Sequence, residues 1–420
     1  MSLVKNVEFL RHLPKLNGFN GLAAFGRGLA PGVHSPLLEV TGFGTNPGAL
    51  RMFSFVPEHL QPAPALVVVL HGCGQTAAGY DLGTGWSTLA NHYGFALLMP
   101  EQQASNNANT CFNWFNPEDT TRDQGEACSI RQMIARMAAD QKIDPRRIYV
   151  TGLSAGGAMT SVMLATYPEV FAGGAIIAGL PYGIASNVRE ALSGMMQSSS
   201  RPASELGDLV RNASKHKGPW PKLSVWHGSA DRTVNPANAD EIVKQWLDLH
   251  GLRPEPMSSG EVDGHPRDVW WNADGETVVE SYTITDMAHG TPLGIADNDE
   301  RYGEGGAFLI EAGISSSYHI ANFFGLTERI LQPKVEQKTE PKTAPKSASK
   351  TTAKAAPTGV SRERAIAMTV PVPAPEPDLA TILWPRAKPA HHAKPQASRR
   401  RGIDVGDVIT RALTAAGLMK

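Results

Sequence analysis

The sequence is poor in cysteine and contains no long apolar run. Its three cysteines, Cys73, Cys111 and Cys128, are too few for a disulfide scaffold, and none has the CxxC or Cys/His spacing of a zinc site. No apolar stretch approaches the roughly 20 residues that a membrane-spanning helix needs. Residues 1–12 lack the apolar core and the small-residue cleavage site of a secretory signal. These absences predict no metal centre and no transmembrane segment. They favour the cytoplasm, with export by another route left open.

Charge is unevenly placed along the chain. The formal net charge is only −1, yet residues 332–400 hold 13 Lys and Arg against 5 Asp and Glu. Lys, Ala, Pro, Thr and Ser dominate this segment, which cannot bury enough apolar surface to offset its ordering entropy. We therefore predict a partly ordered leader over residues 1–35, one folded domain over residues 36–331 and a disordered basic tail over residues 332–400. Residues 401–420 are predicted to form either a short docking helix or a frayed terminus.

Apolar runs alternate with helix-like stretches between residues 65 and 325. The main strands are predicted at residues 65–70, 95–100, 147–151, 172–178, 223–227 and 282–285, and the main helices at residues 86–93, 127–141, 157–165, 237–250 and 317–324. An antiparallel strand pair at 37–43 and 50–56 precedes them, and residues 269–282 are typical of a hairpin. The alternation predicts a doubly wound, mostly parallel α/β sheet.

The segment Gly152-Leu-Ser154-Ala-Gly156 stands between a predicted strand and a predicted helix. This context is that of a nucleophile elbow, in which a sharp turn holds a serine hydroxyl at the mouth of a sheet. The glycines flank the serine because the turn leaves no room for a Cβ atom. The positive end of the helix faces the place where an oxyanion would form. The alternative is a glycine-rich turn with an ordinary serine.

A serine nucleophile needs a base, and the base needs a group that orients it. Asp231 follows the strand at 223–227, and His289 follows the last predicted strand. Ser154, Asp231 and His289 therefore occur in the order that an α/β-hydrolase requires. We predict that they form a catalytic triad. Among other polar residues, we expect a place in the oxyanion loop for His71, a structural role for His227, a solvated ring for His265, and no catalytic role for Asp263 or Asp286.

Two backbone N–H groups are predicted to form the oxyanion hole. One belongs to Ala155, directly after the nucleophile, and the other to Cys73, in the loop after the strand at 65–70. Cys73 is not predicted to be a nucleophile, because no base is placed for its thiol. For Cys111 and Cys128, pairing in an oxidising compartment and free buried thiols both stay open.

Four aromatic residues are candidates for the walls of a substrate pocket, with burial in the core as the alternative for each. They are Trp114, Tyr182, Trp270 and Trp271.

Several motifs together resemble the polyhydroxybutyrate depolymerase-like esterase family. They are His71-Gly-Cys-Gly-Gln75, Cys111-Phe-Asn-Trp-Phe115, Gly152-Leu-Ser-Ala-Gly-Gly-Ala-Met159, Tyr167-Pro-Glu-Val-Phe171, Ala178-Gly-Leu-Pro-Tyr-Gly183, Trp226-His-Gly-Ser-Ala-Asp-Arg-Thr-Val234 and Ala288-His-Gly-Thr-Pro292. The resemblance implies an α/β-hydrolase fold, a Ser/Asp/His triad on Ser154, Asp231 and His289, and no metal or organic cofactor. It implies hydrolysis of short-chain polyhydroxyalkanoate esters, with relatives acting on feruloyl or acetyl esters of plant polysaccharides.

The chain departs from secreted members of that family in two ways, so its compartment stays open. It has no clear secretory signal, and its basic tail stands where a folded polymer-binding module would be. The resemblance implies an extracellular protein, whereas the N-terminus favours the cytoplasm. We predict a serine esterase acting on 3-hydroxybutyrate esters. The alternatives are a feruloyl or acetyl-xylan esterase, a peptidase of the same fold, or a protein that binds anionic polymers through its tail.

Overall fold

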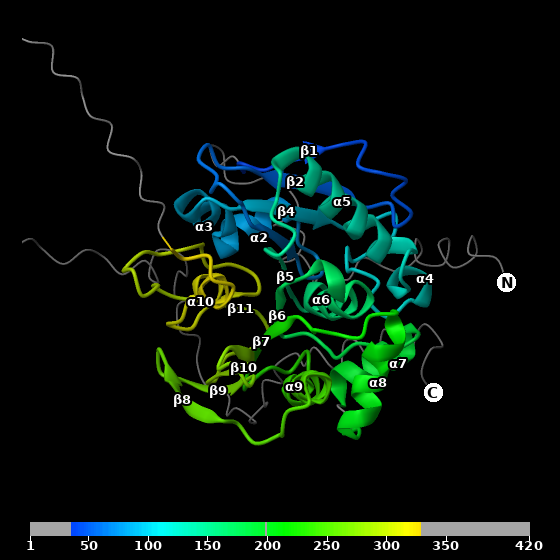
Figure 1. Ribbon diagram of the computed structural model, residues 1–420, viewed down its shortest axis with the longest axis vertical. Coiled ribbons are helices and arrows are strands. Elements are labelled where there is room, and N and C mark those ends of the chain that lie inside the picture. The colour runs from blue at the N-terminus through cyan, green and yellow to red at the C-terminus, as the bar shows by residue number, and fades with distance from the viewer. Residues whose placement is uncertain (1–34, 198–199, 329–420) are drawn as a thin grey trace, which may run out of the picture. The chain divides into compact units, whose positions relative to one another are not determined.

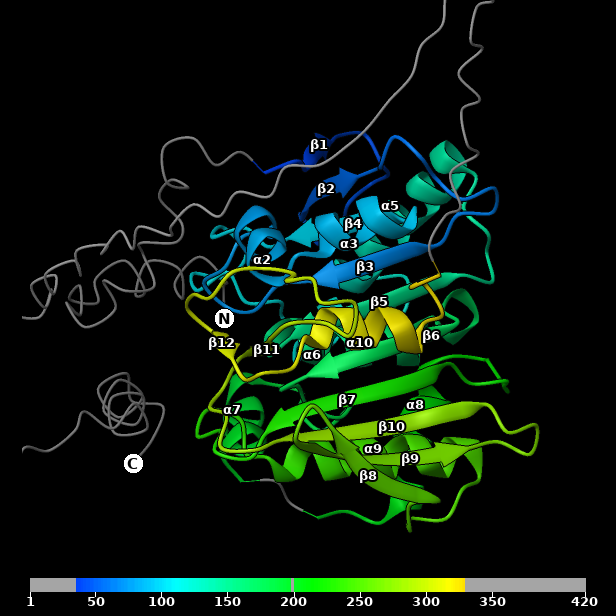
Figure 2. The ribbon, with the colours of Figure 1, turned by 90° about the vertical axis from the view of Figure 1, so that its left-hand side faces the viewer.

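The computed structural model describes residues 35–197 and 200–328. The predicted basic tail at 332–400, the C-terminal segment 401–420 and nearly all of the leader at 1–35 lie outside these residues. The described chain is built on a ten-stranded sheet of order β1-β2-β4-β3-β5-β6-β7-β10-β9-β8 (Figures 1 and 2). No helix among the described residues is long and apolar enough to cross a bilayer.

The centre of the sheet is parallel, and each edge carries an antiparallel pair. The parallel strands, in sheet order, are β4 (Ala96–Glu101), β3 (Leu66–Leu70), β5 (Ile148–Leu153), β6 (Gly173–Ile177), β7 (Lys222–Gly228) and β10 (Thr277–Ile284). The edges are β1 (Leu38–Val40) with β2 (Arg51–Phe55), and β9 (His265–Trp271) with β8 (Ser258–Val262). A separate parallel pair joins β11 (Thr291–Leu293) to β12 (Leu309–Glu311).

Helices cover both faces of the sheet. One face carries α5 (Gly125–Gln141), α6 (Ala155–Thr166), α8 (Ala203–Ala213) and α9 (Ala237–His250), and the other carries α2 (Ala77–Thr84), α3 (Trp86–Tyr93) and α10 (Ser316–Phe323) (Figure 1). The shorter helices are α4 (Pro117–Thr120), η1 (Pro168–Val170) and α7 (Val188–Met196).

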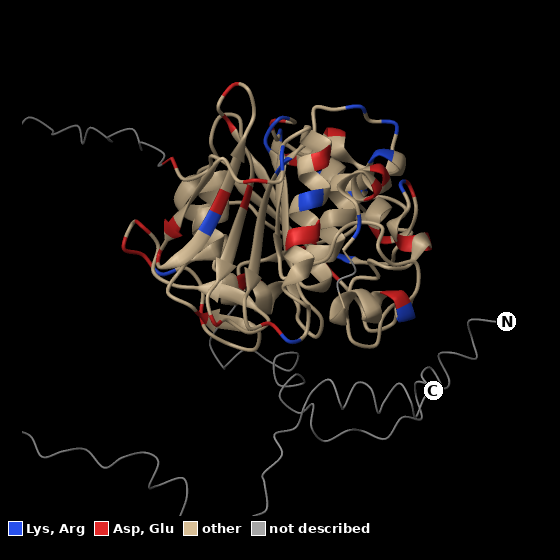
Figure 3. Cartoon of the chain, turned by 90° about the horizontal axis from the view of Figure 1, so that it is seen from below, with Lys and Arg blue, Asp and Glu red and all other residues tan. Residues whose placement is uncertain are grey.

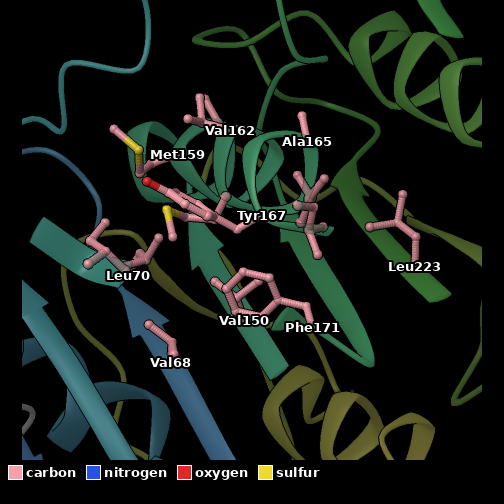
Figure 4. Packing of buried hydrophobic residues seen from close by; sticks show 14 of the residues in the cluster. Val68, Leu70, Val150, Met159, Val162, Ala165, Tyr167, Phe171 and Leu223 are labelled. Carbon is pink, nitrogen blue, oxygen red and sulfur yellow. The ribbon is translucent and has the colours of Figure 1, made fainter. Parts of the chain in front are cut away.

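The packing of β3 explains why its sequence is apolar at every position. Leu66, Val68 and Leu70 point into the core beneath α5 and α6, whereas Val67 and Val69 point into the core beneath α2 and α3. Figure 4 shows the first of these cores, where Leu70 lies toward Met159 of α6 and Val68 lies beside Val150 of β5. Because both faces of a parallel sheet are covered, alternation of polar and apolar residues is lost. The predicted mostly parallel α/β fold is confirmed.

The prediction of single elements was less complete. The separate strand expected at residues 282–285 is wrong, because β10 runs without a break from Thr277 to Ile284. Helix α2 was not predicted, since two glycines weaken its apolar pattern. One of them, Gly83, packs against the side chain of Leu309, whose Cδ1 would lie 2.1 Å from a Cβ atom there and would have to move.

Charged residues of both signs are spread along the described chain (Figure 3). In the view of Figure 3, Lys and Arg alternate with Asp and Glu over helices and loops, and neither sign forms a continuous stripe. Binding of a polyanion usually requires a clustered basic face. The face drawn in Figure 3 therefore does not favour that class of function for the folded body.

Candidate active site

Ser154 stands on a strained turn between β5 and α6. Its backbone angles are φ 57° and ψ −115°, and its N–H donates a hydrogen bond of 2.9 Å to the carbonyl of Ile177 at the end of β6. A positive φ is uncommon for a residue with a side chain, and such strain concentrates at functional sites. The side chain of Ser154 is half-buried. The predicted strand–turn–helix elbow is therefore present.

Both glycines of the elbow are required by close backbone packing. A Cβ atom on Gly156 would lie 2.3 Å from the carbonyl oxygen of Leu70 and 2.6 Å from that of His71. A Cβ atom on Gly152 would lie 2.4 Å from the carbonyl oxygen of Gly156. The elbow therefore packs directly against the loop that follows β3. This contact brings the Ser154 turn close to the segment predicted to supply an oxyanion donor.

His289 and Asp231 form a buried hydrogen-bonded pair. The Nδ1 atom of His289 lies 2.7 Å from Oδ2 of Asp231, whose side chain is fully buried. The other carboxylate oxygen, Oδ1, accepts hydrogen bonds from the N–H groups of Thr233 (2.8 Å) and Val234 (2.9 Å). Because a carboxylate only accepts, Nδ1 of His289 carries the proton and Nε2 is left with its lone pair. A neutral imidazole in this tautomer can act as a base through Nε2.

The Asp231 carboxylate is held in its ionised form. Burial by itself would raise the pKa of this group, but hydrogen bonds from His227 and His289, together with the Val234 N–H, hold the pKa well below its usual range. The carboxylate is therefore negative near pH 7.

The loops that carry the pair are joined to each other. Strands β7 and β10 are neighbours, with Gly228 opposite Ile284. The Ala230 N–H donates to the carbonyl of Met287 (3.1 Å), and a Cβ atom on Gly228 would lie 2.2 Å from the same oxygen. Close packing of these backbones brings His289 to Asp231.

Ser154 lies at the same edge of the sheet as this pair. Strands β5, β6 and β7 are parallel neighbours, so their carboxyl ends meet at one edge, where ligands bind in open α/β sheets. No hydrogen bond joins Ser154 Oγ to His289 among residues 35–197 and 200–328. Catalytic hydrogen bonds are often long before substrate binds. Completion of the triad by Ser154 stays a prediction.

In the segment 72–75 of the loop after β3, the backbone N–H of Cys73 differs from that of its neighbours. The Gly72 N–H donates to Gln75 Oε1 (2.8 Å), the Gly74 N–H to the carbonyl of Asn109 (2.8 Å), and the Gln75 N–H to the carbonyl of Gly72 (3.3 Å). No described residue accepts from the Cys73 N–H. The first N–H groups of a helix also lack intrahelical acceptors, and Ala155 begins α6. These two free donors are compatible with the predicted oxyanion hole.

His71 supports this loop rather than taking part in proton transfer. Its Nδ1 donates to the carbonyl of Gly72 (2.8 Å), and its Nε2 accepts from the Gln102 N–H (3.1 Å). Burial lowers the pKa of His71 to about 4, although the bond to Gly72 opposes the shift. The ring is therefore neutral near pH 7 and fixes the start of the loop.

The cysteines pair differently from the sequence-based alternatives. Cys73 and Cys111 form a disulfide, while Cys128 of α5 is free and half-buried. Pairing of Cys111 with Cys128 is therefore wrong. The physical reason is the path of the polar loop, which crosses the segment after β3 and bonds to Gly74 through Asn109 and Thr110. The disulfide thus ties the candidate oxyanion donor to the loop opposite.

Loss of this disulfide should slow turnover more than it weakens binding. In Cys111→Ser the Cys73 backbone is freed to move, and a poorly placed oxyanion donor is expected to lower kcat for p-nitrophenyl butyrate by about 10- to 100-fold with little change in KM. Cys128→Ser removes the free thiol and should keep wild-type kinetics. A Cys111→Ser enzyme with unchanged kcat would show that the loop needs no covalent support.

The four aromatic candidates have different positions. Trp114 and Trp270 are buried in the core, and Trp270 Nε1 donates to the carbonyl of Glu255. Tyr182 is half-buried, and its backbone is held on both sides by Gln245 of α9. Trp270 and Trp271 pair with the first residues of β10, so they lie at the sheet edge opposite the Asp–His pair. They are not walls of this site, because β9 runs away from it.

Sequence reasoning missed Phe308 and misjudged His265. The Phe308 ring lies edge-on to the His289 ring, with centroids 5.9 Å apart. Phe308 also lines a small pocket with the loop after β3. Its place in a loop between β11 and β12 gave no signal in the sequence. The His265 ring is buried, not solvated, and bridges the Thr285 N–H and the carbonyl of Ala312.

One group of described side chains has the composition of a cation site. It consists of Asp263, Asp297 and His319, whose ligand atoms lie within 4.8 Å of one another. His319 Nε2 already bonds to Asp263 Oδ2 at 2.9 Å. This hydrogen bond accounts for the contact without a metal.

The parallel sheet, the elbow and the Asp–His pair at its carboxyl edge define an α/β-hydrolase. An acetyl xylan esterase from Aspergillus awamori has the same fold, with a TM-score of 0.59 and 24% identity over 69% of this chain and 99% of that structure. A family model described as esterase PHB depolymerase matches residues 55–258. The poly(3-hydroxyalkanoate) depolymerase C of Paucimonas lemoignei is 49% identical over 69% of this chain and 70% of that protein. An acetylxylan esterase of Coprinopsis cinerea is 32% identical over 61% of this chain and 69% of that protein.

The chain belongs to the PHB depolymerase esterase family. It is a carboxylic ester hydrolase.

Proposed function

We propose that the protein hydrolyses short-chain polyhydroxyalkanoate esters, and 3-hydroxybutyrate esters in particular, with Ser154 as nucleophile. The observation that carries the proposal is the 2.7 Å hydrogen bond between His289 and Asp231 at the sheet edge that also bears the Ser154 elbow. The substrate class is supported by the 49% identity to a poly(3-hydroxyalkanoate) depolymerase. No cofactor takes part in the proposed chemistry.

The reaction begins with proton transfer from Ser154 to Nε2 of His289. The serine oxygen attacks the ester carbonyl as the proton leaves, and the N–H groups of Cys73 and Ala155 stabilise the negative oxygen of the tetrahedral intermediate. Asp231 holds the ring in the tautomer that accepts at Nε2 and stabilises the imidazolium that forms. His289 then gives the proton to the leaving alcohol.

The second half returns the enzyme to its starting state. Water attacks the acyl group on Ser154 and transfers a proton to His289, and the acid leaves as Ser154 recovers its proton. Each proton taken by His289 is thus given back within the same half-reaction. The side chain of Asp231 exchanges no proton, in line with the lowered pKa of its carboxyl.

The substrate class is tested with a panel of matched esters. We expect kcat/KM for 3-hydroxybutyrate oligomers to exceed that for feruloylated sugars and acetylated xylan by about tenfold or more. Chromatography of the released acids measures all three reactions in one assay, with Ser154→Ala as the blank. Faster release of ferulate or acetate would overturn the polyester assignment and leave the esterase mechanism in place.

A second substrate class is favoured by the other relatives. The acetylxylan esterase of Coprinopsis cinerea and a feruloyl esterase B of Neurospora crassa are 32% and 36% identical to this chain. An acylated plant polysaccharide is therefore the alternative substrate in the same panel. Contact of residues 332–400 with anionic polymers stays a prediction from charge alone, outside the described residues.

A further inference from the structure

A second imidazole reaches the carboxylate of Asp231. The ring of His227, at the end of β7, is buried, and its Nε2 lies 3.2 Å from Oδ2 of Asp231. This is the same oxygen that accepts from His289 at 2.7 Å. The His227 Nε2 also lies 3.0 Å from the carbonyl oxygen of Val234. One carboxylate oxygen is therefore shared by two histidines, only one of which the proposed chemistry uses.

The contacts of His227 identify its tautomer. The carbonyl of Val234 can only accept, so the neutral ring carries its proton on Nε2 and donates it to Val234, with Oδ2 of Asp231 3.2 Å from the same nitrogen. The other nitrogen, Nδ1, is buried with no hydrogen-bond partner in the described chain. A buried polar atom without a partner is unfavourable. An apolar side chain would fill the space without this cost, so packing alone does not explain a histidine here.

The Asp231 carboxylate is contacted on both of its oxygens. Oδ1 accepts from two backbone N–H groups, of Thr233 and Val234, Oδ2 accepts from His289, and the His227 Nε2–H lies beside Oδ2 at 3.2 Å. A carboxylate offers about four acceptor positions, and each has a polar N–H group close to it. Without the His227 donor, Oδ2 is held only by the ring that must move its proton during turnover.

We propose that His227 is a positioning residue, whose Nε2–H fixes Oδ2 of Asp231 in line with Nδ1 of His289. This inference rests on the proposed function, because it assigns His289 as the base. The donor also disperses part of the negative charge of the carboxylate. Its loss leaves that charge free to attract the proton on His289 more strongly. His289 then becomes the neutral ring that can accept a proton from Ser154 only at higher pH.

The charged groups around His227 come from three elements. Asp231 follows β7, His289 follows β10, and Asp240 of α9 interacts electrostatically with the His227 ring. Of these groups, Asp231 is the one in direct contact with the His227 ring nitrogen. The change in pH dependence is therefore assigned to the Asp231–His289 pair, which loses the N–H group beside Oδ2 of Asp231.

The test compares His227→Gln with His227→Asn. The amide nitrogen of Gln reaches the place of Nε2, whereas that of Asn reaches only the place of Nδ1 and leaves Asp231 without the donor. We expect the Asn variant to lose about 10- to 100-fold in kcat for p-nitrophenyl butyrate, with KM within about twofold of wild type. Its acidic midpoint in the pH profile of kcat/KM should move upward. The Gln variant should recover most of the activity and the wild-type midpoint.

A half-buried histidine elsewhere supplies the control. His250 of α9 bonds to the carbonyl of Pro221 at 3.2 Å and contacts no residue of the Asp–His pair, so His250→Asn should alter thermal stability and leave the pH profile unchanged. Equal losses in Gln and Asn at position 227 with an unmoved midpoint would show a packing role and overturn the proposal, as would wild-type kinetics in the Asn variant. Full activity of Ser154→Ala would instead refute the proposed function itself.

Discussion

Replacing Ser154 by Ala is expected to lower kcat for p-nitrophenyl butyrate by about 10⁴-fold or more. The variant keeps the elbow, because Ala tolerates the backbone angles of φ 57° and ψ −115° about as well as Ser does. It removes the only atom that can form the acyl-enzyme in the proposed mechanism. Residual turnover would come from the oxyanion donors acting on bound substrate and water. Initial rates with a sensitive chromogenic ester measure the loss.

The matched control is a serine two turns further along the same helix. Ser161 is buried in α6, and its hydroxyl donates to the carbonyl of Leu180 at 2.7 Å, far from any reacting atom in the proposed mechanism. Ser161→Ala should lower the free energy of unfolding by about 1 kcal/mol and leave kcat unchanged. Retention of esterase activity by a folded Ser154→Ala protein would remove the basis of the serine mechanism.

The central sheet and the elbow were predictable because their signals are local. Residues 66–70 are apolar at every position, as a strand covered on both faces must be, and β3 occupies them. The flanking glycines of Ser154 predicted a turn without room for Cβ atoms, and the backbone of Gly156 and of the residues Leu70 and His71 fills that space. Asp231 and His289 could be paired in advance because each follows a strand of the same parallel sheet.

The features that could not be predicted from the sequence depend on the direction of a strand or on the path of a loop. Trp270 and Trp271 follow the pattern of a strand, but only the antiparallel pairing of β9 with β10 places them away from the site. The partner of Cys73 depends on how a polar loop crosses the molecule. His227 was expected to be structural, and its contact with Asp231 appears only once the turn after β7 is folded. None of these has a fixed spacing in the chain.

Asp231→Asn is the second change with a large expected effect, because it reverses the hydrogen bonding of the pair. The amide oxygen of Asn is expected to take the two backbone N–H groups of Thr233 and Val234, which leaves the amide N–H₂ facing both histidines. His289 then has to accept at Nδ1, which places its own proton on Nε2. A ring in that tautomer cannot take the proton of Ser154. We expect kcat to fall by about 10⁴-fold with little change in KM.

The neighbouring loop offers a control of the same chemistry. Asp286 lies in the loop that carries His289, is exposed, and has φ 56°, a conformation that Asn adopts as readily as Asp. Asp286→Asn should therefore retain wild-type kinetics and stability. If instead Asp286→Asn were inactive and Asp231→Asn kept more than about one tenth of wild-type kcat, the orienting carboxylate would have to be reassigned to Asp286. The 2.7 Å hydrogen bond from His289 to the fully buried carboxylate favours Asp231. Water would compete for any hydrogen bond between the His289 ring and the exposed Asp286, which would weaken that bond.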